Sequence, residues 1–129
     1  MSFALSWNGQ ELTARTVDEV DAALDRLHEQ FGTSKATIVT VTWISTGNSL
    51  SIGLGRDQTV LSYVAGNGDL PYFASRGGAD VDGCVVFFFQ DDWSEFPLRQ
   101  VVPVTAGRAA VREFCATGER SADVTWEEV

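Results

Sequence analysis

Alternation of apolar and polar positions begins at the N-terminus and predicts a β-hairpin. Phe3, Leu5 and Trp7 alternate with small or polar residues, which is the period of a half-buried strand. The Asn-Gly pair at 8–9 is a strong signal for a tight turn. We therefore expect the chain to return over 10–14 as a short partner strand.

A helical pattern follows over 17–31. Its apolar residues recur at three- and four-residue spacing and form one stripe: Val17, Val20, Leu24, Leu27 and Phe31. Thr16 and Glu19 have the spacing of a capping box at the start of this helix, and Gly32 fits its end.

Alternation returns over 36–44, 50–55 and 60–65 and predicts an antiparallel meander of three strands. Within the second strand, Gly53 and Gly55 leave one face bare, which suits a bulge or the close approach of another backbone. This glycine pair lacks the third glycine, the following helix and the Lys-Ser/Thr of nucleotide-binding loops, so a structural role is favoured.

The second half of the chain predicts further short strands and a second helix. The expected elements are a strand over 71–75, a flexible loop over 76–83, a buried strand over 84–90, a loop over 91–97, a strand over 98–102, a helix capped by Thr105 and stopped by Gly118, and a final strand or docked tail around Val124 and Trp126. This order predicts an α+β fold, an antiparallel sheet of about five to seven strands with two helices packed mainly on one face. A length of 129 residues predicts a single domain over 1–129.

The net charge of −9 narrows the classes of partner. Such a surface repels nucleic-acid phosphates and anionic membranes and attracts a basic protein, although solubility alone explains the acidity equally well. We find no apolar run long enough to cross a bilayer and no signal-peptide pattern, so we expect a cytoplasmic protein with no membrane partner.

The residues that could carry catalysis or bind a metal are few. His28 is the only histidine, and we expect Cys84 and Cys115 to be buried free thiols. A Cys84–His28 nucleophile pair is conceivable, but no spacing supports it. The acidic pairs at 80/82 and 91/92 lack the other ligands of a calcium loop. The sequence therefore predicts no enzyme, no cofactor and no metal site.

The segment over 91–96 is more suggestive. Asp91, Asp92 and Glu95 bracket Trp93 and Phe96, and exposed aromatic residues among acids are typical of a protein interface. The alternative is that the two aromatic side chains fold back into the core and the acids merely fringe them.

These patterns together resemble the first-numbered immunity-protein family of bacterial polymorphic toxin systems. The resemblance covers about 36–126. The matching features are Leu50–Gly55 followed by Asp57, the Val60–Tyr63 strand, the Gly66–Gly68 turn, Tyr72-Phe73 with Ser75, the acidic-aromatic segment, a helix ending near Phe114 and Gly118, and Trp126.

The resemblance implies a non-enzymatic antitoxin that binds and inhibits a cognate toxin, typically of the deaminase superfamily. The family's pattern fixes no set of binding residues. From the acidity we expect a basic toxin domain whose active site is occluded by an acidic surface, in a monomer or a heterodimer with the toxin and without direct nucleic-acid contact. The residues expected to bind the toxin are Asp91, Asp92, Trp93, Glu95 and Phe96, helped by Asp80, Asp82, Arg56 and Asp57.

An alternative hypothesis is a small-ligand-binding α+β module without catalysis. It requires an apolar cavity between the curved sheet and the helix over 17–31, with a few polar groups pointing into it. An enzyme would instead require several ionisable side chains converging in one cleft.

Overall fold

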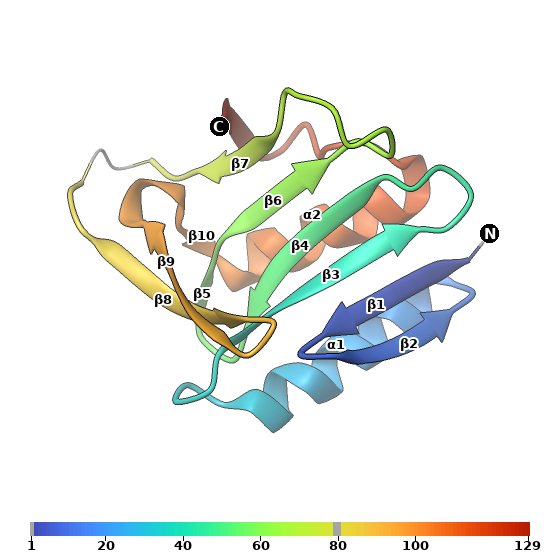
Figure 1. Ribbon diagram of the computed structural model, residues 1–129, viewed down its shortest axis with the longest axis horizontal. Helices are drawn as coiled ribbons and strands as arrows, with labels where there is room; N and C mark the ends of the chain where they lie inside the picture. The colour runs from blue at the N-terminus through green and yellow to red at the C-terminus, as the bar shows by residue number, and fades with distance from the viewer. Residues whose placement is uncertain (1, 79–80) are drawn as a thin grey trace.

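The computed structural model describes residues 2–78 and 81–129 (Figure 1). In chain order its elements are β1 Phe3–Trp7, β2 Gln10–Ala14, α1 Val17–Phe31, β3 Thr37–Trp43, β4 Ser49–Leu54, β5 Gln58–Thr59, β6 Leu61–Val64, β7 Phe73–Arg76, β8 Cys84–Phe89, β9 Asp92–Pro97, the 3-10 helix η1 Leu98–Gln100, β10 Val102–Pro103, α2 Val104–Thr117 and β11 Thr125–Glu128.

One large sheet dominates the described part of the chain. Seven of its nine strands follow the order β11-β7-β6-β4-β3-β1-β2, with antiparallel neighbours, and the β8–β9 hairpin joins β3 through one parallel pair, Thr37 with Phe88. Strands β5 and β10 form a separate two-stranded sheet. The α+β class is confirmed, while the predicted count of five to seven strands is too low.

Helices α1 and α2 cover the same face of the large sheet (Figure 1). Strand β4 alternates apolar residues with small ones. Its apolar residues are fully buried against this layer: Leu50, Ile52 and Leu54. Leu24 of α1 and Phe114 of α2 are fully buried in the same core. These side chains fill the space in which the small-ligand hypothesis places its cavity.

The β8–β9 hairpin lies across the opposite face of the sheet, near one end of β3 and β4 (Figure 1). Its Phe87 ring packs on Gly53, where a Cβ atom would lie 2.7 and 2.8 Å from the ring atoms Cδ1 and Cζ. Gly55, with φ of 115°, packs against the backbone of Gly32. The prediction of a close backbone approach is thus confirmed at Gly55, while Gly53 receives a side chain.

Local capping signals place most helix ends correctly. Thr16 Oγ1 accepts from the Glu19 backbone N–H at 3.1 Å, and Gly118 ends α2 in the left-handed conformation with φ of 77°. The start of α2 is an exception, because Pro103 and not Thr105 is its N-cap. Since Pro103 still pairs with Gln58 in the small sheet, the chain passes directly from strand to helix.

Three further predictions about elements in the second half of the chain are wrong. The strand over 84–90 is not buried on both faces, because within β8 only Phe87 is buried and Phe89 is 41 % exposed. The segment over 91–97 is strand β9 and not a loop, because Gln90 and Asp91 adopt positive φ angles of 51° and 64° and close a two-residue turn. The segment over 98–102 is not a strand of the large sheet: it forms η1 and then enters the small sheet, which Pro103 ends because it lacks an N–H for the ladder.

Candidate partner-binding surface

The register of the β8–β9 hairpin decides which of its side chains face the sheet. Phe87 lies opposite Ser94 and Phe88 lies opposite Trp93, and successive residues point to opposite sides of the hairpin. Phe87 and Phe96 share the side that faces the sheet, with ring centroids 6.1 Å apart. Trp93 and Glu95 therefore occupy the outer side.

The structure separates the two aromatic residues of the acidic segment. Trp93 is 69 % exposed, whereas Phe96 is half-buried and packs against a small core cluster that contains Phe87. Phe88 lies opposite Trp93 in the hairpin, and the Lys35 ammonium lies 4.5 Å from the centroid of the Phe88 ring in a cation–π contact. The expectation of an exposed aromatic anchor therefore fits Trp93, and the alternative of folding back fits Phe96.

Three carboxylates surround this hairpin. Asp91, Asp92 and Glu95 are all exposed, and no cation of the described residues forms an ion pair with them. The Asp91 backbone N–H donates to Asn8 Oδ1 at 2.9 Å, which ties the hairpin turn to the β1–β2 turn. The Asp91 carboxylate is thus presented on a turn that is held in place, and Asp92 and Glu95 follow on β9.

The other residues expected to bind the toxin differ in their exposure and contacts. Arg56 donates to the Val86 carbonyl and stacks its guanidinium 5.1 Å from the Phe87 ring centroid, so its side chain anchors the hairpin. Asp57 is exposed on the neighbouring turn, and Asp82 is exposed shortly before β8. Asp80 lies outside the described residues.

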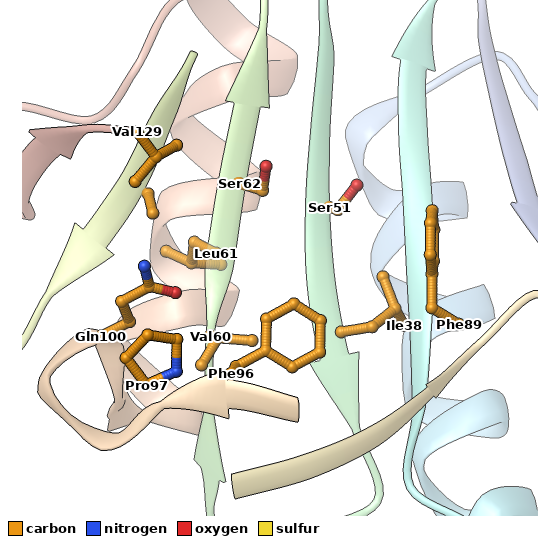
Figure 2. A pocket seen from close by; sticks show the side chains of 11 residues that line it. Ile38, Ser51, Val60, Leu61, Ser62, Phe89, Phe96, Pro97, Gln100 and Val129 are labelled. Atoms are coloured by element: carbon orange, nitrogen blue, oxygen red, sulfur yellow. The ribbon is translucent and has the colours of Figure 1, made fainter. Parts of the chain in front are cut away.

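A groove runs between the hairpin and the uncovered face of the sheet (Figure 2). It has a volume of about 310 Å³ and is mostly apolar; its lining residues are Ile38, Ser51, Val60, Leu61, Ser62, Ala74, Phe89, Phe96, Pro97, Gln100 and Val129. Sequence reasoning missed this groove. The small residues Ser51 and Ser62 in the middle of apolar strands were the available signal.

A second hollow adjoins the groove on the side of the β1–β2 turn. Ile38 and Phe89 line both hollows, and Glu11 and Asn8 line only the second. The uncovered face of the sheet is therefore hollowed from β7 across to β1.

The histidine and the two cysteines are placed as follows. His28 Nδ1 accepts from the Gly55 backbone N–H at 2.9 Å, which fixes the end of β4 to α1. Cys115 is buried as predicted, and burial raises the pKa of its thiol to about 12. Cys84 is exposed at the open end of the hairpin, so the prediction that it is buried is wrong.

Within residues 2–78 and 81–129, no three His, Cys, Asp or Glu side chains gather as metal ligands. In the same part of the chain, neither helix combines the length and apolar character that spanning a bilayer requires.

Comparison with known proteins adds one finding. A family model described as "Immunity protein Imm1" matches residues 8–128, a range that includes the hairpin, both helices and every residue lining the groove except Val129. No curated protein gives a match to this sequence.

Proposed function

The chain belongs to the Imm1 family of immunity proteins, and on that premise we propose that it inhibits a cognate toxin domain by covering its active site with the β8–β9 hairpin. The inhibition is by binding alone, without catalysis. The toxin is proposed to be a nucleic-acid deaminase with a basic substrate channel.

The observation that carries this proposal is the exposure of Trp93 among carboxylates that have no ion-pair partner in the described residues. Trp is enriched among the residues that dominate binding energy at protein interfaces. Unpaired surface carboxylates steer and orient a positively charged partner. Glu95 lies on the outer side of the hairpin with Trp93, while Asp91 lies in the adjoining turn and Asp92 on the other side of β9.

The partner class follows from the same charges. An enzyme that acts on nucleic acid binds phosphates with Lys and Arg side chains along its substrate channel. Carboxylates on a rigid hairpin can pair with those cations and exclude the substrate. The resemblance to a family typically paired with deaminase toxins supports this choice of toxin.

A pair of charge reversals on the hairpin tests the surface. The double variant is Asp92→Lys with Glu95→Lys, because both residues lie in strand β9. Asp91 is left unchanged, because a Lys there would be strained by the backbone φ of 64°. At roughly 1 kcal/mol for each reversed charge, we expect the Kd for the toxin to rise about 30-fold. Isothermal titration calorimetry at two salt concentrations should also show a weaker salt dependence for the variant.

The matched control reverses two exposed acids away from the hairpin, Asp69→Lys with Asp123→Lys. It changes the net charge by the same amount and should leave the Kd within about threefold of the parent, since distant charges are screened. Equal weakening by both pairs would show that only net charge matters. No weakening by the hairpin pair would mean that the toxin binds elsewhere.

The toxin class has its own test. The purified toxin domain should convert cytosine or adenine bases of an oligonucleotide to their deaminated products, and this chain should abolish the conversion at a one-to-one ratio. A toxin that cleaves the strand without deaminating it would refute the proposed class and leave the binding surface in place.

A further inference from the structure

We propose that the groove on the uncovered face of the sheet receives an extended, basic segment of the toxin. This inference rests on the proposed toxin binding and adds a second contact region beside the outer side of the hairpin. It assigns the partner's chemistry at that region: a peptide backbone with small or apolar side chains, followed by Lys or Arg.

Small side chains on the floor of the groove allow a polypeptide backbone to approach the sheet closely. Ser51 pairs with Ser62 and Ser62 pairs with Ala74 across three neighbouring strands, so small side chains form a continuous row. Phe96 and Pro97 of β9 stand over one side of this row (Figure 2). A row of small side chains beside an apolar wall leaves room for a chain lying along it.

Gln100 supplies the observation that points to a peptide. The residue is only 7 % exposed, and Figure 2 shows its side-chain amide directed into the groove. Its backbone carbonyl accepts from Ser75 Oγ at 2.6 Å, but its side-chain amide has no hydrogen-bond partner among the described residues. Both amide atoms reach the open side of the groove, and a peptide group offers the matching acceptor and donor there.

The charges around the two hollows indicate that the bound toxin segment is positively charged. No Lys or Arg lines either hollow, while Glu11 lines the second and the exposed Asp92 lies opposite Phe89 at their junction. Because the two hollows adjoin at Ile38 and Phe89, the site is elongated and suits a chain more than a compact molecule. We place the segment's cationic residue at the Glu11 end.

Two variants of the full-length protein test the groove. Gln100→Leu removes the amide at nearly constant volume; the free protein should melt at the same temperature or higher, because the amide bonds to nothing within it. Ser62→Trp fills the groove from its floor. With the toxin domain encoded beside this chain as the probe, we expect the Kd to rise about tenfold for Gln100→Leu and more for Ser62→Trp.

Matched controls make the same chemical changes elsewhere. Gln58→Leu removes an exposed amide from β5, and Ala22→Trp adds a Trp to the exposed side of α1. Both should bind the toxin as tightly as the parent. Gln100→Leu alone decides the test if Ser62→Trp does not fold.

Each outcome has a distinct meaning. If the parent binds and both groove variants bind equally well, the groove assignment is wrong and the proposed function stands. If the parent itself does not bind, the proposed function fails and the inference fails with it. If the parent dimerises at the working concentration and Ser62→Trp abolishes only that dimer, the occupant is a second copy of this chain and the toxin assignment is overturned.

Discussion

Replacing Gly53 by Ala should lift the β8–β9 hairpin from the sheet. The added Cβ would lie 2.7 and 2.8 Å from Cδ1 and Cζ of the Phe87 ring, distances that real Cβ atoms essentially never show. Phe87 cannot yield easily, because its ring is fully buried between Gly53, Phe96 and the Arg56 guanidinium.

The magnitude follows from two opposing effects. Overpacking a close-packed site costs about 1–3 kcal/mol, while Gly→Ala lowers the entropy of the unfolded chain and recovers about 0.4–1 kcal/mol. We expect a net loss of about 1–2 kcal/mol for Gly53→Ala. Combining it with Phe87→Leu, which makes room for the methyl group, should cost less than the sum of the two single changes by about 1 kcal/mol or more.

Urea unfolding followed by tryptophan fluorescence measures these free energies. Gly78→Ala is the matched control, since nothing lies within 4 Å of its Cβ position, and it should change stability by less than about 0.5 kcal/mol. A Gly53→Ala protein as stable as the parent, or strict additivity with Phe87→Leu, would refute the packing of the hairpin described above. Because Phe96 of the same hairpin walls the groove, Gly53→Ala should also weaken toxin binding.

The two cysteines carry the remaining predictions. Cys84 is exposed and Cys115 is buried, so a thiol reagent should label one thiol at once and the second only on unfolding; rapid labelling of both would contradict the burial of Cys115. Because folding raises the pKa of Cys115 from 9.0 to about 12, the folded state holds this proton more tightly, and the stabilisation is lost as pH rises above the unfolded pKa. Between about pH 9 and 10.5 the free energy of unfolding should fall by about 2 kcal/mol from this thiol. Cys115→Ala should flatten that alkaline decline in urea titrations, and an unchanged slope would contradict it.

Local signals predicted the elements whose ends are set by neighbouring residues. The stripe and caps of α1 gave its bounds, and the Asn-Gly pair at 8–9 gave the first hairpin. Gly118 marked the end of α2 because only a residue that tolerates positive φ fits there.

Elements that depend on distant partners could not be predicted in the same way. The β8–β9 turn uses Gln90 and Asp91 with positive φ and contains no glycine, so the usual hairpin signal was missing. The segment around Val124 and Trp126 was predicted as either a strand or a docked tail, and its pairing with β7, some fifty residues earlier in the chain, makes it strand β11. The sequence therefore underestimated the number of strands.

The candidate site was predicted only as far as its composition. The acids and aromatic residues over 91–96 were recognisable, but the exposure of Trp93 and the burial of Phe96 follow from the hairpin register. The role of Arg56 as an anchor and the groove with Gln100 follow from placing β9 over β4 and β6. Neither the anchoring role of Arg56 nor the groove is visible in the local sequence pattern.

Co-expression with the product of the adjacent reading frame tests the central claim most directly. Cells that express that toxin domain alone should die, and cells that also express this chain should survive and yield a stable one-to-one complex on purification. Death of the cells despite abundant, folded protein from this chain, with no complex recovered, would contradict its role as the immunity protein for that toxin.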